Sequence, residues 1–402
     1  MNAFNVIDLD LAGADAPHAN AVAASRQGAR PVVGRRLALT GSLCLSLLAR
    51  VASAQPGPAA TQVVAAPDGT VVDAPVAAQT TAPPTVDADP AQFEDGRPIA
   101  GVESHVRVWH KDTALAQKAV ARALGELERV HAKLAADIRT SEVATINRAA
   151  DREEVLVSAE TVHLLSRAQE LCRTSGGAFD ASVGSYDYLW NFRRRPAVRP
   201  LDTELAARQA MVGCDKLVLK PDRIVRLMTR GTRLRLDDLA HGAAMEAAAR
   251  QLRQAGIENF RIRIGADVYV AGRTGQRHWY VAVRHPENPR RDLVQLYLTS
   301  HAAATRHRAE HSFYKDGVRY HDAIDPRTGK PAGGVVLATV IGVDAAQADG
   351  LSAAVFVLGP QAGIALLDRI DRVEGFVVDT KGKVYASRGM ADFARLPERI
   401  DL

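Results

Sequence analysis

The sequence predicts an α+β fold, with mainly antiparallel sheets and packed helices in a single domain. Strand patterns occur in runs and helix patterns occur in runs, without the steady alternation of strand and helix that indicates a parallel sheet. The chain has 402 residues, of which 47% are hydrophobic and 24% charged, a composition that can bury a sizeable core.

The amino-terminal region is predicted to be an export signal over residues 1–54. Arg35 and Arg36 precede an apolar stretch at 37–48, and a small-residue A-x-A site follows at 52–54. Such a stretch is too short to cross a bilayer of about 30 Å as a helix. The paired arginines indicate the twin-arginine route, so we expect a periplasmic protein.

A linker is expected to follow this signal. Residues 55–93 are rich in Pro and Ala and cannot bury enough surface to offset the entropy lost on ordering, so we expect disorder there. The pattern changes at about residue 95, and we place the folded domain at 95–395.

The first elements of the domain follow from their periodicity. Valines alternate with polar residues over 102–109, which predicts a strand. Apolar residues recur every three or four positions from Ala116 to Leu134, which predicts an amphipathic helix. Ser158 is a good N-cap for a second helix, which we expect to end at the glycines 176–177.

The remaining elements come from shorter signals. Phe260, Ile262 and Ile264 alternate with arginines and predict a strand that turns at 265–267 into a second one at 268–270. An Ala-rich helix before it is expected to end at Gly256. We expect further strands at 216–220, 224–228, 232–236, 278–284, 294–300, 335–343, 374–378 and 383–386, and helices at 239–255, 345–357 and 361–369.

Charge and cysteine usage limit the function classes. The net charge of +5 comes without a basic run, so we expect no nucleic-acid partner. Cys44 falls in the predicted signal, and Cys172 and Cys214 remain, without the spacing of a zinc or redox motif. A disulfide between these two suits an oxidising compartment, but the sequence leaves the pairing open.

Two loop segments are candidates for chemistry. Residues 176–184, GGAFDASVG, place Asp180 after a tight glycine turn, where its carboxylate can accept hydrogen bonds. Residues 324–331, IDPRTGKP, either form an ordinary turn or hold an anionic oxygen through Arg327, Thr328 and backbone N–H groups.

Two helix segments also carry acidic side chains. Asp349 and Ala353 share one helix face, and Asp349 either ligates a hard cation such as Mg2+ or lies at the surface. Asp237 and Asp238 begin the Ala-rich helix, where they complement the helix dipole or supply further metal ligands.

Taken in order, these segments resemble the ApbE family of FAD:protein FMN transferases over roughly residues 100–390. The matching parts are SEV…N at 141–147, GGAFDASVG with LW at 176–190, IRIGADVYVAG at 262–272, YHDAIDPRTGKP at 320–331 and AQADGLSAAVFVLG at 346–359.

The resemblance implies an ApbE-like α+β domain that binds FAD and uses Mg2+. Its activity would be transfer of FMN from FAD to a Thr or Ser hydroxyl of a partner protein, with release of AMP. The implied acceptor is an exported or membrane-attached redox protein. The implied site has Ala178, Phe179, Asp180, His241 and Ala323 at the flavin, Asp349 and the backbone carbonyl of Asp238 at the metal, and Asp322 or His321 as proton acceptor.

This chain departs from the family pattern at several of these positions. Arg235 stands where the family has Asp, His241 where it has Lys, Asp322 where it has His, and Ala353 where it has Thr; residues 304–307 read ATRH in place of ATSG. Two other hypotheses therefore stay open. The protein is a flavin-binding or partner-binding member without catalysis, or it hydrolyses the pyrophosphate of FAD with water as acceptor.

Overall fold

The computed structural model describes residues 91–99, 101–190, 192, 198–274, 277–308 and 311–402. These residues belong to one compact unit, Ala82–Leu402. The predicted export signal, and the predicted linker up to residue 90, lie outside the described residues. The first strand already begins at Ala91, inside the last three residues that we assigned to the linker. Within the described residues, every helix is too short or too polar to span a membrane.

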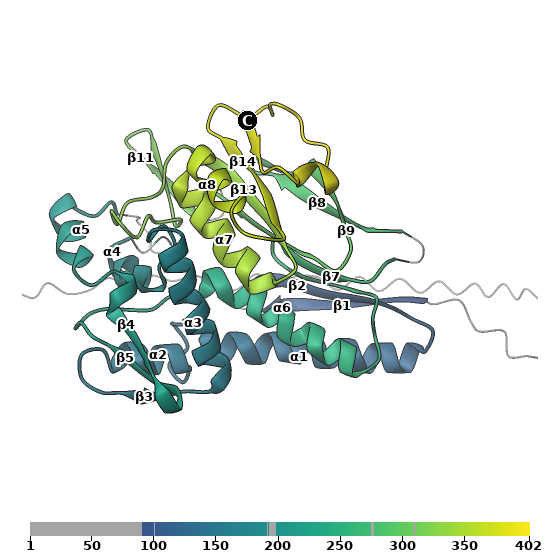
Figure 1. Ribbon diagram of the computed structural model, residues 1–402, viewed down its shortest axis with the longest axis horizontal. Helices are drawn as coiled ribbons and strands as arrows, with labels where there is room; N and C mark the ends of the chain where they lie inside the picture. The colour runs from purple at the N-terminus through teal and green to yellow at the C-terminus, as the bar shows by residue number, and fades with distance from the viewer. Residues whose placement is uncertain (1–90, 100, 191, 193–197, 275–276, 309–310) are drawn as a thin grey trace, which may run out of the picture. The chain divides into compact units, whose positions relative to one another are not determined.

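An antiparallel sheet of eight strands forms the centre of the fold (Figure 1). Each neighbouring pair in it is antiparallel, as the α+β prediction requires. In spatial order the strands are β1 (Ala91–Ile99), β2 (Val102–His110), β6 (Phe260–Ile264), β7 (Asp267–Ala271), β10 (Ala302–His307), β13 (Val335–Gly342), β14 (Val373–Asp379) and β15 (Val384–Ala386).

The two faces of this sheet are covered differently. On β7, Tyr269 packs into the core on the helix side, whereas Val268 and Val270 pack into a second core with the opposite layer. Such alternation follows from the two-residue repeat of a strand. The helix layer contains α1 (Thr113–Leu134), α6 (Asp237–Gln254), α7 (Ala345–Leu358) and α8 (Pro360–Leu367), and the opposite layer contains the hairpin of β8 (Trp279–His285) and β9 (Asn288–Leu298).

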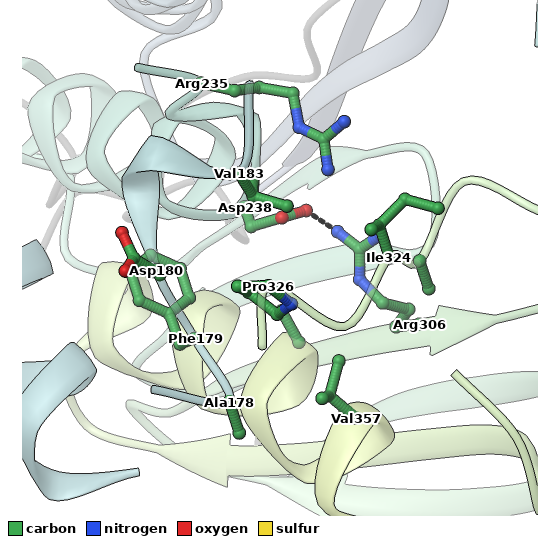
Figure 2. A pocket seen from close by; sticks show the side chains of 12 residues that line it. Ala178, Phe179, Asp180, Val183, Arg235, Asp238, Arg306, Ile324, Pro326 and Val357 are labelled. Atoms are coloured by element: carbon green, nitrogen blue, oxygen red, sulfur yellow. Dashed lines mark ion pairs between the residues drawn. The ribbon is translucent and has the colours of Figure 1, made fainter. Parts of the chain in front are cut away.

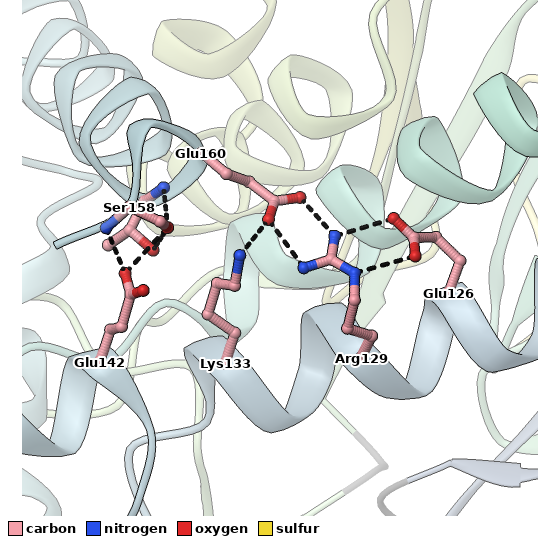
Figure 3. Close-up of polar contacts among 7 residues, drawn as sticks. Glu126, Arg129, Lys133, Glu142, Ser158 and Glu160 are labelled. Carbon is pink, nitrogen blue, oxygen red and sulfur yellow. Dashed lines mark hydrogen bonds and ion pairs between the residues drawn. The ribbon is translucent and has the colours of Figure 1, made fainter.

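Helix α1 confirms the predicted amphipathic pattern. Asp112 caps it by accepting a hydrogen bond from the N–H of Leu115, and the predicted apolar positions are all buried. Its exposed edge contacts α3 (Ala159–Thr174) through charges (Figure 3). Arg129 and Lys133 of α1 both donate to the Glu160 carboxylate, with donor–acceptor distances of 2.6–3.0 Å.

Helices α6 and α7 approach unusually closely at Gly242. A Cβ atom at this position would lie 2.3 Å from the backbone oxygen of Ala345 and 2.4 Å from the Cα atom of Ala346. Only a residue without a side chain fits such a backbone approach. The contact brings the start of α6 beside α7, and both helices contribute to the site described below.

The prediction of a strand at 232–236 is wrong. This segment has no strand partner, and its polar backbone groups bind side chains and a neighbouring loop. Asn147 donates to the carbonyl of Leu234 and accepts from its N–H, at 2.9 and 2.7 Å. The N–H of Arg235 donates to the carbonyl of Ala181 at 2.7 Å. These hydrogen bonds satisfy the backbone groups of 232–236 without pairing to another strand. The alternation of apolar and polar residues in the sequence does not distinguish this case from a strand.

Several helices and strands were not predicted, because their sequence patterns are weak or atypical. The strand β10 consists mainly of small residues, Ala302 to Ala304, which do not favour strands. The other missed elements are β1, α2 (Glu142–Arg148), β3 (Val155–Leu156), α4 (Asp187–Trp190), α5 (Asp202–Gln209), β11 (Ser312–Lys315) and β12 (Val318–His321). The predicted strands at 216–220 and 224–228 are β4 (Leu217–Lys220) and β5 (Ile224–Leu227).

A disulfide joins Cys172, near the end of α3, to Cys214. It settles the pairing that the sequence left open. The closed loop of 42 residues contains the whole GGAFDASVG segment, so the bond limits how far this segment moves from α3.

We predict that removing this bond destabilises the domain. Cys172→Ala with Cys214→Ala should lower the free energy of unfolding by about 2–4 kcal/mol, because the unfolded chain regains the entropy of an open loop. Chemical denaturation under oxidising conditions measures the loss. A reducing agent should destabilise the wild type by a similar amount and leave the double variant unchanged; an equal effect on both would contradict the assignment.

Candidate functional site

A pocket lies where five segments that are distant in the sequence meet (Figure 2). They are the GGAFD loop, the segment entering α6, the end of β10, the loop that follows β12, and α7. The pocket is lined by Ala178, Phe179, Asp180, Val183, Arg235, Asp238, Arg306, Ala323, Ile324, Pro326, Ala353 and Val357. Five of the residues predicted at the flavin or the metal are therefore brought together here.

The GGAFD loop presents Asp180 from a tightly held turn. The N–H of Gly177 closes the end of α3 by donating to the carbonyl of Cys172 at 2.8 Å. Asp180 then caps the next short helix, because its carboxylate accepts from the N–H and the hydroxyl of Ser182 at 2.8 and 2.6 Å. Burial raises the pKa of Asp180, although the bonds from Ser182 oppose the shift. The side chain thus shapes the loop as well as the pocket wall.

The IDPRTGKP loop satisfies its own polar groups. Arg327 donates from its backbone N–H and its Nε atom to the Asp325 carboxylate, each at 2.9 Å. The hydroxyl of Thr328 accepts from the backbone N–H of Lys330 at 3.2 Å. Ile324 and Pro326 of this loop line the pocket, whereas Arg327 does not. The structure therefore favours the turn interpretation over an anion site at Arg327.

Asp238 forms an ion pair with Arg306 inside the pocket (Figure 2). Asp238 lies in the first turn of α6 and Arg306 near the end of β10, and both side chains are largely buried. The Nη2 atom of Arg306 contacts the carboxylate, while its buried Nε atom has no hydrogen-bond partner among the described residues. The side chain of Asp238 is thus paired with a cation of the protein, whereas the predicted metal ligand is its backbone carbonyl.

Arg235 brings a second guanidinium group to the same pocket. Its Nη1 atom donates to the carboxylate of Asp187 at 2.7 Å. Burial opposes its charge, but the carboxylates of Asp187, Asp237 and Asp322 outweigh burial and raise the pKa of Arg235. In Figure 2 the guanidinium groups of Arg235 and Arg306 lie on either side of the Asp238 carboxylate.

Asp349 connects the two closely packed helices. It is 4% exposed, and its carboxylate accepts a hydrogen bond at 3.0 Å from the N–H of Gly242 in α6. Burial and the nearby charge of Asp267 raise the pKa of Asp349 well above its ordinary value. It does not line the pocket, whereas Ala353, one turn later, does.

His241 belongs to a polar group beside the pocket. Its Nδ1 atom lies 3.0 Å from the Asp267 carboxylate, whose other oxygen accepts from the N–H of Thr305 at 2.9 Å. Burial disfavours the charged ring, but Asp267 outweighs it and raises the pKa of His241 to about 9. His241 is therefore a cation at neutral pH. We predicted it at the flavin, but it does not line the pocket.

The two predicted proton acceptors lie in different surroundings. The ring of His321 is buried, packs edge-on against Phe356 and has no hydrogen-bond partner at Nδ1 among the described residues. Burial lowers the pKa of His321 to about 4, which makes the ring a weak base. Asp322 is partly exposed and directly precedes Ala323 of the pocket wall.

The residues present do not fit a Mg2+ site in this arrangement. The Asp238 carboxylate is paired with Arg306, and Ala353 offers no oxygen where a hydroxyl ligand would stand. Of these three side chains, only Asp349, whose carboxylate accepts one hydrogen bond from Gly242, is left with an oxygen for a cation. Among the described residues, the one cluster with metal-ligand spacing is Asp180 with Cys172 and Cys214, whose sulfur atoms form the disulfide.

Two residues of this site were not predicted as site residues. Arg306 drew attention only as a departure from ATSG, and a positive side chain at a position normally small is the signal that could have identified it. Asp267 follows a turn and begins a strand that is buried throughout. A carboxylate in a buried strand requires charged or hydrogen-bonding partners, so an Asp at this position indicates a polar site nearby.

Comparison with known proteins gives consistent matches. The sequence model of the ApbE family matches residues 100–377. An FAD:protein FMN transferase of Vibrio cholerae is 30% identical over 275 residues, covering 66% of this chain and 82% of the relative. One of Haemophilus influenzae is 25% identical over 296 residues, covering 71% and 85%.

Solved structures agree with this result. The crystal structure of the ApbE protein from Thermotoga maritima matches with a TM-score of 0.71 and 26% identity, covering 76% of this chain and 100% of that one. The flavin transferase ApbE from Vibrio cholerae matches with a TM-score of 0.67 and 26% identity, covering 76% and 99%.

We predict that His241 makes stability depend on pH. Its pKa rises from 6.5 to about 9 on folding, so its stabilising effect is complete below pH 6.5 and is lost as pH rises through 9. In His241→Gln, the free energy of unfolding should fall less over this window than in the wild type, as measured by denaturation at several pH values. His163→Gln, an exposed histidine of α3, is the control; equal slopes in both variants would refute the assignment.

Proposed function

Because this chain belongs to the ApbE family, we propose that it transfers FMN from FAD to a Thr or Ser hydroxyl of a partner protein. The observation that carries the proposal is the pocket, which gathers three of the matched segments, 176–190, 320–331 and 346–359, from separate parts of the chain. In the reaction, the acceptor oxygen forms a bond to the phosphorus of the FMN half. The pyrophosphate P–O bond breaks, AMP leaves, and the hydroxyl proton passes to a base.

The flavin nucleotide would lie against the wall made by Ala178, Phe179, Asp180 and Ala323. All four line the pocket, and Phe179 adds an aromatic surface to it. His241 does not line the pocket, and its positive charge is held by Asp267. It would therefore support the site by holding Asp267, whose other oxygen accepts from the N–H of Thr305 beside Arg306.

Asp322 is the better candidate for the base that accepts the hydroxyl proton. It is partly exposed beside the pocket, and an ionised carboxylate can accept a proton at neutral pH. The ring of His321 is buried and packs against Phe356, so it is less accessible to an acceptor hydroxyl than Asp322 is. We therefore assign the proton to Asp322 and a packing role to His321.

Mg2+ is the cation that the family resemblance implied, with Asp238 and Asp349 as ligands. Because the Asp238 carboxylate is paired with Arg306 and Ala353 lacks a ligand oxygen, we assign no step to a metal ion in this chain. The charge on the pyrophosphate needs another partner, which is addressed below.

The acceptor that we propose is an exported or membrane-attached redox protein, and the site of action is the periplasm. The Arg35–Arg36 signal supports export by the twin-arginine route. The disulfide between Cys172 and Cys214 supports the same compartment, because such bonds persist in oxidising surroundings.

We predict that the purified protein modifies an acceptor. Incubation with FAD and an exported redox protein with an exposed Thr should add one FMN group to that Thr and release AMP in equal amount. Mass spectrometry of the acceptor and chromatography of the nucleotides measure both products. Formation of FMN and AMP with an unmodified acceptor would indicate the hydrolase, and bound but intact FAD would indicate a member without catalysis.

We further predict that Asp322→Asn lowers kcat for transfer by about 100-fold, the usual contribution of a general base. The affinity for FAD, measured by flavin fluorescence, should stay close to that of the wild type. Asp316→Asn is the matched control, because Asp316 is exposed in the turn of the same hairpin. A full rate in Asp322→Asn would show that another group accepts the proton.

A further inference from the structure

We propose that Arg306 and Arg235 bind the pyrophosphate of FAD directly, so that this protein binds FAD without a divalent cation. The inference rests on the proposed function, which makes FAD the ligand of the pocket. It concerns three of the residues at which this chain departs from its family, Arg235, Arg306 and Ala353, which line the pocket.

Arg306 is held in place for this role by Asp238. The carboxylate contacts the Nη2 atom of the guanidinium, which carries five N–H donors in a planar fork, and the Nε donor stays without a partner among the described residues. The ion pair with Asp238 therefore orients the guanidinium of Arg306 and leaves other N–H donors of this group available for a ligand. In this chain Asp238 is a positioning residue for Arg306.

The remaining donors of Arg306 indicate what the group binds. Its Nε atom is buried and has no hydrogen-bond partner among the described residues. Buried N–H groups are normally paired, and an unpaired one in a pocket points to a missing acceptor. Adjacent N–H groups of a guanidinium match two phosphate oxygens in a bidentate contact. A phosphate oxygen would satisfy the Nε donor while Asp238 keeps Nη2.

Arg235 supplies the second positive group. It lines the same pocket, and Asp187 anchors it through Nη1. Like Arg306, it is therefore held in position by a carboxylate. A pyrophosphate diester carries two negative charges, and two guanidinium groups match them. The positive charge that a metal ion would bring to the anion is thus supplied by the chain.

The changes at the expected metal ligands agree with this assignment. Ala353 contributes a methyl group to the pocket, and the Asp349 carboxylate is bound by the N–H of Gly242. Position 353 has lost the hydroxyl oxygen of the family pattern, and position 306 nearby has gained a fixed cation. If the arginine takes over the role of the metal ion, both the loss of the hydroxyl and the gain of the cation are explained.

The test compares FAD affinity with and without divalent cation. Flavin fluorescence titrations of the full chain in EDTA and in excess MgCl2 should give the same Kd for the wild type. Arg306→Gln should raise the Kd for FAD about tenfold in EDTA, as expected for the loss of a charge-assisted contact. Its Kd for riboflavin, which has no phosphate, should not change. MgCl2 should partly restore FAD binding to this variant, because Asp238 is then free to bind the ion.

Two further variants keep the result interpretable. Arg308→Gln removes the same charge two residues away, where Arg308 pairs with Glu287 outside the pocket, and should bind FAD like the wild type. Arg306→Lys keeps the charge without the fork and should bind FAD with intermediate affinity. Thermal unfolding of all three confirms that they are folded.

Three results would overturn the inference. They are a wild-type Kd that rises about tenfold in EDTA, an Arg306→Gln protein that binds FAD like Arg308→Gln, and an equal loss of affinity for riboflavin. The first two leave the proposed transfer intact, because FAD still binds. A wild type that binds neither flavin in either buffer would overturn the proposed function together with the inference.

Discussion

The close approach of α6 and α7 at Gly242 is the constraint on which the site depends. The backbones meet at a distance that a side chain would prevent, and the N–H of Gly242 binds the Asp349 carboxylate across the contact. This contact places the first turn of α6, with Asp238, beside the face of α7 that carries Ala353. One buried hydrogen bond and one glycine therefore set the width of the pocket on its helical side.

The other side of the pocket is built from loops that are braced by neighbouring elements. The GGAFD loop is held to the end of α3 by the bond from the N–H of Gly177 to the carbonyl of Cys172, and its Asp180 caps the short helix that follows. The IDPRTGKP loop is held by Trp190, whose indole N–H donates to the carbonyl of Gly329 at 2.6 Å. Side chains on such supports keep their positions when a ligand enters, which lowers the entropy lost on binding.

Electrostatically the site consists of paired charges. Arg306 with Asp238 and His241 with Asp267 each combine a cation with a largely buried carboxylate, and the largely buried Arg235 pairs with the more exposed Asp187. Burying any one of these groups alone is unfavourable, so the members of a pair depend on each other. This dependence explains why the departures from the family pattern at Arg235, His241 and Arg306 come with acidic partners close by.

The sequence by itself determined the fold class, the long helices and the order of the family segments, because these depend on local periodicity, capping residues and turns. The heptad-like spacing in α1 and the N-cap at Ser158 are examples. Only the tertiary structure decided the Cys172–Cys214 pairing, the backbone bonds of 232–236 and the use of Asp238 by Arg306. Hydrogen bonds and ion pairs depend on distances through space, and the separation of two residues along the chain does not determine those distances.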